Sequence, residues 1–144
     1  MINSIIEAIS VALNEEFGDS YEIHMEEIRQ GLKEPCFFIQ SLNPTYELFL
    51  GKRYFRKNQF CIQYFPATDE KQRECNETAE RMWQCLEYIT IYGEDKPTRG
   101  TKMEYEVIDG VLNFFVNYDC FVYKTEQQTP MEILEVNTSV KEGG

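Results

Sequence analysis

The residues that could do chemistry in this sequence are a single histidine, His24, five cysteines and many carboxylates. His24 could act as general base for a cysteine or serine nucleophile. It alternates with apolar residues on the polar side of an extended segment, which is typical of an exposed structural histidine. No G-x-S-x-G motif marks a nucleophile, and the glycines form no phosphate-binding motif. The sequence therefore predicts no catalytic residue and no cofactor site, and a small cytosolic cysteine hydrolase using His24 is kept as an alternative.

The cysteines also fail to form a metal or disulfide framework. Their number is odd, no two form a C-x-x-C pair, and they are Cys36, Cys61, Cys75, Cys85 and Cys120. Structural zinc sites and disulfide frameworks need closer or more regular spacing. We therefore expect buried free thiols that behave as small hydrophobic residues, and no bound metal.

Charge and composition narrow the class of function. The net charge of −11 disfavours a protein that holds nucleic acid through its phosphates, which requires clustered Lys and Arg. The sequence contains no apolar run long enough to span a membrane, and its start lacks the basic region of a signal peptide. We therefore expect a protein made and kept in a cytosol, without sequence-specific nucleic-acid binding or a membrane partner. The aromatic share of 14% is high and is typical of sheets and of protein interfaces.

One short segment reverses the sign of the charge. Lys52, Arg53, Arg56 and Lys57 stand within six positions and flank Tyr54 and Phe55, while the first 34 residues are acidic. Opposed patches favour pairing between copies of the chain, for example against Glu22, Glu26 or Glu27. A loop that only needs polar residues would give the same pattern. The residues that we predict at an interface are Lys52, Arg53, Tyr54, Arg56, Lys57, Phe115, Phe121 and Tyr123.

Periodicity predicts the elements that position these residues. Spacing of three and four indicates a helix over residues 2–17 that ends at Gly18, and a second helix of about five turns from a capping box at Asp69 and Gln72 through Ile89. Alternation or continuous apolar runs indicate strands over residues 21–28, 35–40, 46–55 and 60–65. Asn43-Pro44 and Asn58 are expected to separate these strands.

The strongest local signal is Asp109-Gly110, which favours a two-residue type I′ hairpin turn. The turn fixes a register in which paired residue numbers sum to 219, so that Val107 faces Leu112 and Met103 faces Val116. The outer side of the second arm, which carries Phe115, Phe121 and Tyr123, is too aromatic for an ordinary solvated face.

The order of elements predicts an α+β fold with a single mainly antiparallel sheet, two helices packed on one face and a C-terminal Asp-Gly hairpin. We expect one domain over residues 1–124 and a partly flexible C-terminal extension over residues 125–144, because the extension begins with a polar linker and its last residues, 137–144, have little apolar surface.

Several segments together resemble the tail terminator family of phages and prophages of Gram-positive bacteria. They are Glu34 to Ile39, Gly51 to Arg56 running into Phe60 to Pro66, and Asp109 to Val116. The resemblance covers residues 1 to about 124, and it rests on the order and spacing of the segments.

The resemblance implies a structural, non-enzymatic subunit that forms a ring, usually of six copies, on the completed tail tube. Its expected partners are other copies of itself, the tail tube protein and a head-completion or neck protein. Its expected location is the host cytoplasm during assembly and then the tail–neck junction of the virion. A neck or head–tail connector component and, from a different class, a small-ligand-binding module remain the alternatives.

Overall fold

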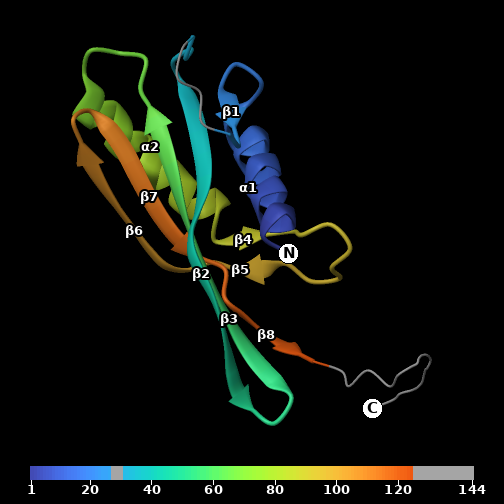
Figure 1. Cartoon of the computed structure of the whole chain (residues 1–144). Helices are drawn as coiled ribbons and strands as arrows, with labels where there is room; N and C mark the ends of the chain where they lie inside the picture. Colours follow the sequence, from blue (N-terminus) through green and yellow to red (C-terminus); the bar gives the residue numbers. More distant parts are fainter. Residues whose placement is uncertain (27–30, 125–144) are drawn as a thin grey trace. The chain divides into compact units, whose positions relative to one another are not determined.

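The structure is a computed structural model that describes residues 1–26 and 31–124 (Figure 1). It divides into two compact units. The first, which we call the core unit, comprises residues 1–44 and 57–119, and the described part of the second, which we call the hairpin unit, comprises residues 45–56 and 120–124. The prediction of one domain over residues 1–124 stays a prediction, and the predicted extension at 125–144 lies outside the described residues.

Two helices and eight strands make up the described part of the chain. In chain order they are α1 (Ile2–Phe17), β1 (Glu22–His24), β2 (Cys36–Leu50), β3 (Arg53–Phe65), α2 (Lys71–Cys85), β4 (Tyr88–Ile89), β5 (Thr98–Arg99), β6 (Thr101–Ile108), β7 (Val111–Asn117) and β8 (Cys120–Tyr123).

The main sheet has the strand order β1-β2-β3-β7-β6, and β8 also pairs with β3. The β1–β2 pair is parallel, whereas β7 and β8 both run antiparallel to β3. β4 and β5 form a separate antiparallel pair. The predicted α+β class with a mainly antiparallel sheet is therefore confirmed.

The core lies between the helices and one side of the sheet. Alternate residues of β3 and β7 are buried there, for example Ile62, which pairs with Phe114. Ile9 of α1 and Met82 of α2 belong to the same buried cluster, so both helices cover this side (Figure 1). The regular burial follows from the period-two alternation of strands and the three-four spacing of helices.

Two sequence predictions are confirmed in detail. α1 covers residues 2–17 and ends at Gly18, which has a positive φ of 90°. Asp109 and Gly110 have φ values of 52° and 75°, as a type I′ turn requires. The predicted register holds from Glu104 to Ile108 but fails beyond, because an irregularity at Lys102, with a φ of 53°, pairs Thr101 with Asn117.

The expected breaks between the first strands are wrong. β2 continues through Asn43-Pro44, and the chain reverses instead at Gly51-Lys52, where Gly51 has a φ of 60°. β3 likewise passes through Asn58, which is fully buried. The Asn58 backbone N–H donates to Asp119 at 2.8 Å and its amide donates to the Tyr118 carbonyl at 3.0 Å, so these polar groups remain satisfied inside the strand.

Two further boundaries differ from the sequence prediction. The strand expected over 21–28 contains only Glu22–His24 in the described residues, and residues 27–30 lie outside them. α2 begins after Glu70 without a side-chain cap and ends at Cys85, while Ile89 lies in β4. The predicted capping box is wrong, since no side chain caps the helix, and Glu74 instead accepts hydrogen bonds from the backbone N–H groups of Ala67 and Thr68 in the preceding loop.

Candidate functional site

The hairpin unit brings together most of the residues predicted at an interface. Residues 45–50 of β2 and 53–56 of β3 are joined through Gly51-Lys52, and β8 pairs with β3 from Arg53 opposite Tyr123 to Arg56 opposite Cys120. The Lys124 backbone N–H donates to the Lys52 carbonyl at 2.9 Å, which extends this pairing. Strand alternation then places Arg53 and Arg56 on opposite sides of the small sheet.

One side, which we call the phenylalanine face, consists of Phe49, Arg53, Phe55, Phe121 and Tyr123. The Phe121 ring lies 5.2 Å from that of Phe49 and 5.1 Å from that of Phe55, measured between centroids. The Arg53 guanidinium stands over Phe121 at 4.6 Å and over Phe49 at 5.4 Å. These cation–π contacts hold the charge above an aromatic surface.

The other side, which we call the tyrosine face, consists of Tyr46, Tyr54, Arg56 and Lys124. The two tyrosine rings stack with centroids 4.9 Å apart. The Arg56 guanidinium lies 5.4 Å from the Tyr46 ring centroid, and the Lys124 ammonium lies 5.8 Å from that of Tyr54. The Arg56 and Lys124 cations therefore both contact the same stacked pair of tyrosine rings.

Several large apolar side chains of the hairpin unit are exposed to solvent. Leu50 is 69% exposed and Tyr123 is 73% exposed, and other large exposed residues of the unit are Tyr46, Leu48, Phe49 and Phe121. Over residues 45–56 and 120–124 the sequence has four basic residues and one acid, a net charge of +3. Within the described residues, no carboxylate pairs with Arg53 or Arg56, and the Nε atoms of both are buried without a hydrogen-bond acceptor.

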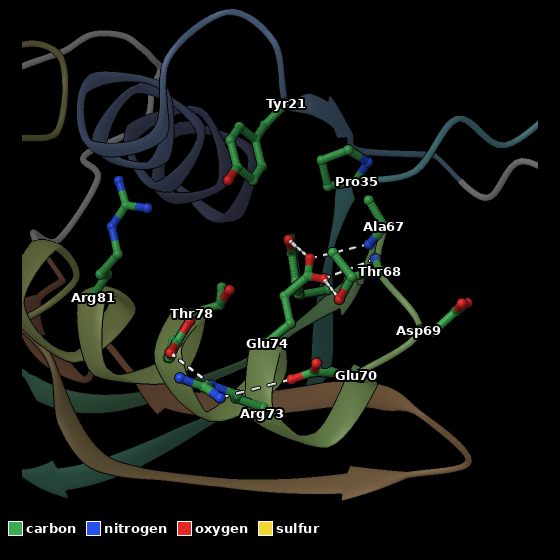
Figure 2. A pocket seen from close by; sticks show the side chains of 12 residues that line it. Tyr21, Pro35, Ala67, Thr68, Asp69, Glu70, Arg73, Glu74, Thr78 and Arg81 are labelled. Carbon is green, nitrogen blue, oxygen red and sulfur yellow. Dashed lines mark hydrogen bonds and ion pairs between the residues drawn. The ribbon is translucent and has the colours of Figure 1, made fainter.

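A second feature, in the core unit, is a cleft of about 620 Å³ beside the start of α2 (Figure 2). Tyr21, Pro35 and Tyr64 supply its apolar and aromatic wall, and α2 supplies most of its charged residues. Figure 2 shows Glu74 at its centre, with dashed lines to several donors.

Glu74 is fully engaged by its surroundings. It accepts hydrogen bonds from the backbone N–H groups of Ala67 and Thr68, from the Thr68 hydroxyl and from the Tyr64 hydroxyl. Burial raises the pKa of Glu74, but the hydrogen bonds from Thr68, Tyr64 and Ala67 outweigh burial and leave the pKa below its usual value. Glu74 therefore braces the loop before α2, as a structural carboxylate does.

The other cleft charges are less tightly held. Arg73 makes long pairs with Glu70 at 3.8 Å and Glu77 at 3.5 Å, and all three side chains are largely exposed. Arg81 instead binds Glu16, with 2.9 Å to the carboxylate and 2.8 Å to the backbone carbonyl. Asp69, Glu70 and Glu77 thus line the cleft as accessible carboxylates.

The structure separates the predicted interface residues into two groups. Lys52, Arg53, Tyr54, Arg56, Phe121 and Tyr123 belong to the hairpin unit, whereas Lys57 and Phe115 belong to the core unit. Phe115 pairs with Cys61 of β3 on the sheet side opposite the helices. Sequence reasoning missed Tyr46, Phe49 and Lys124, although the alternation before Gly51 could have marked the first arm of this hairpin.

Burial raises the pKa of Cys36, Cys61, Cys75 and Cys85, which makes these four cysteines poorly suited to nucleophilic chemistry. Burial, with smaller contributions from nearby Glu34 and Glu22, raises the pKa of Cys36 to about 11, and burial raises that of Cys85 to about 12. A thiol must lose its proton to act as a nucleophile, so such shifts oppose reactivity. His24 lies 3.2 Å from Glu22, measured from Nε2 to Oε1. In residues 1–26 and 31–124, no group of three His, Cys, Asp or Glu residues could hold a metal ion.

No helix of the described residues has the length and hydropathy to cross a membrane.

Comparison with known proteins adds an independent finding. No curated protein sequence matches the chain significantly. A family model described as phage tail terminator protein matches residues 4–130, which is most of the 144-residue chain. The protein therefore belongs to the phage tail terminator family, whose members are structural proteins of phage tail assembly.

Proposed function

We propose that this protein forms a ring, usually of six copies, that caps the completed tail tube and presents a surface to the head-completion or neck proteins. Family membership supports a role in tail assembly. The observation that carries the finer proposal is the hairpin unit, whose exposed aromatic faces and net positive charge are typical of an interaction surface. The protein would assemble in the host cytoplasm and remain at the tail–neck junction of the virion.

The physical argument rests on exposed area and charge. A short strand ribbon is stable only when something packs against it, and contiguous exposed apolar patches commonly mark binding sites. Tyr, Trp and Arg are also the residues that most often dominate binding energy at interfaces. The hairpin unit has a net charge of +3, whereas the whole chain has a net charge of −11. The unit is therefore attracted to acidic surfaces, such as those on the remainder of another copy of the chain.

Ring formation should depend on the tube. A terminator that closed rings in solution, away from a tube end, would not stop the tail tube from growing. We therefore expect weak self-association in solution and stable association on tube ends. A mainly acidic subunit would also let DNA pass through a ring without binding tightly, because like charges repel.

The test uses tail tubes of the phage that encodes the chain, assembled without it. Electron microscopy should show that the wild-type protein caps these tubes and limits their length. Arg53→Glu combined with Arg56→Glu should abolish capping, because both faces of the hairpin unit then carry reversed charge. Circular dichroism and thermal melting should show an intact fold.

The matched control reverses two exposed charges in the core unit, Lys96→Glu with Arg99→Glu, and should still cap tubes. A wild-type chain that stays monomeric at high concentration and also in the presence of tubes would refute the ring. A large fall in the melting temperature of the Arg53/Arg56 variant would assign these arginines to the fold instead of an interface.

A further inference from the structure

We infer that the tyrosine face of one copy docks into the cleft beside α2 of a neighbouring copy. The inference rests on the ring proposed above, and it names the two surfaces that meet there. The cleft offers the aromatic wall of Tyr21 and Tyr64 together with accessible carboxylates, and the tyrosine face offers aromatic rings with two cations.

The tyrosine face is the more basic side of the hairpin unit. Arg56 and Lys124 both lie over its rings, at 5.4 and 5.8 Å. Glu47 is the single acid of the unit, and strand alternation from Tyr46 places it on the phenylalanine face with Arg53. The tyrosine face therefore presents two positive charges, whereas those of Arg53 and Glu47 cancel on the other side.

The cleft has the complementary charge. Four acids and two bases line it, and one of these bases, Arg81, is engaged by Glu16. Glu70 and Glu77 are held only by the long, exposed pairs with Arg73. Exposed pairs of this kind contribute little stability, so both carboxylates can turn toward an incoming cation at small cost.

The spacing of the charges also agrees. Glu70 and Glu77 are seven residues apart at the start of α2, which corresponds to about 10 Å along a helix. Arg56 pairs with Cys120, four residues before Lys124, which corresponds to about 13 Å along an extended strand. Long Arg and Lys side chains can cover the remaining difference.

Two of the acidic residues considered from the sequence fit less well. Glu22 already pairs with His24, and Glu27 lies outside the described residues. A contact between two different surfaces of identical chains is also heterologous, and heterologous contacts are those that close into rings. A second copy is therefore the occupant that satisfies both the charge and the symmetry.

A charge-exchange experiment tests this pairing. One variant carries Arg56→Glu and Lys124→Glu, and a second carries Glu70→Lys and Glu77→Lys. Each alone should associate at least about a hundredfold more weakly than the wild type, because like charges then face each other in every contact. Mixing the two variants should restore association, since an alternating ring pairs only opposite charges.

Association is measured by sedimentation velocity across concentrations and by capping of tail tubes, with circular dichroism to verify the fold. The matched controls are Lys96→Glu with Arg99→Glu, which reverses exposed bases outside the tyrosine face, and Glu94→Lys with Asp95→Lys, which reverses exposed acids outside the cleft. Both controls should leave self-association close to that of the wild type.

The outcomes separate this inference from the ring itself. Normal association of the cleft variant, or failure of the mixture to recover, would overturn the docking while leaving the ring in place. A wild-type chain that never associates would remove both proposals. Binding of labelled single-stranded DNA that is lost with Arg56→Glu and Lys124→Glu, with association unchanged, would assign the tyrosine face to nucleic acid and also overturn the docking.

Discussion

At the residue scale, Glu74 shows how one carboxylate organises a turn. Its four donors come from Tyr64, Ala67 and Thr68, so a single side chain ties the end of β3 to the first turn of α2. The same hydrogen bonds explain why the pKa of Glu74 is lowered although burial raises it. Burial, together with the contact to Glu74, raises the pKa of Tyr64, so its hydroxyl remains a donor at neutral pH.

Replacing Glu74 by Gln should lower the free energy of unfolding by about 1–2 kcal/mol at neutral pH, because charge-assisted hydrogen bonds are lost in a partly exposed site. Since folding lowers the pKa, the wild-type contribution is complete above the unfolded value and disappears as pH falls through the folded value. Urea denaturation at pH 7 and pH 3 should therefore show a difference between the proteins that shrinks at low pH.

The control for that experiment is Glu77→Gln, which removes a single exposed pair and should cost less than about 0.5 kcal/mol. Equal stability of wild type and Glu74→Gln at pH 7 would show that solvent replaces the hydrogen bonds without loss.

The raised pKa values of the buried thiols give a second prediction at this scale. His24→Ala should leave tube capping unchanged, because the residue contacts Glu22 and the raised pKa values of Cys36 and Cys85 leave these thiols protonated. Ser at the buried positions Cys36, Cys61 and Cys75 should lower only the melting temperature. An activity that His24→Ala abolishes in a folded protein would instead favour a hydrolase.

At the element scale, the ends of β6 and α2 meet at Gly100. Its N–H donates to the Glu87 carbonyl at 2.7 Å. A Cβ atom built there would lie 2.8 Å from Cγ2 of Val116 and 2.9 Å from the Leu86 carbonyl oxygen. The glycine is therefore required by close backbone approach and not by its own dihedral angles.

Gly100→Ala should lower the free energy of unfolding by about 1–3 kcal/mol, because a methyl group forced against fixed backbone strains a packed core. Thermal melting beside Glu94→Ala, an exposed loop substitution, measures the effect. An alanine variant as stable as the wild type would mean that β6 can move away from α2 without lowering the free energy of unfolding.

At the scale of the whole molecule, charge is divided between the units. The hairpin unit has a net charge of +3 within a chain of −11, so attraction between copies should be mainly electrostatic. Opposed charges also steer encounter, which helps a subunit that must find a tube end.

Self-association should therefore weaken as salt rises, since the screening length falls from about 10 Å at 0.1 M to about 3 Å at 1 M. Sedimentation velocity at both salt concentrations provides the measurement. Association that strengthens with salt would indicate that the exposed rings of the hairpin unit, and not its cations, dominate the contact.

The sequence by itself determined the local features of this protein. α1, the type I′ turn at Asp109-Gly110 and the α+β class follow from periodicity and turn chemistry, which act over a few neighbouring residues. The resemblance to tail terminators likewise depended on the order of such segments, and the family match over residues 4–130 bears it out.

Tertiary structure alone decided where the longer strands break and which interface residues share a side. Asn58 remains inside β3 because Asp119 and Tyr118, distant in sequence, accept hydrogen bonds from its backbone N–H and its side-chain amide nitrogen. Arg53 and Arg56 form one basic run in the sequence but lie on opposite faces of β3 because strand side chains alternate, and the pairing of β8 with β3 adds Phe121 and Tyr123 to the face of Arg53. Partners that are remote along the chain leave no periodic signal, so only the folded arrangement reveals them.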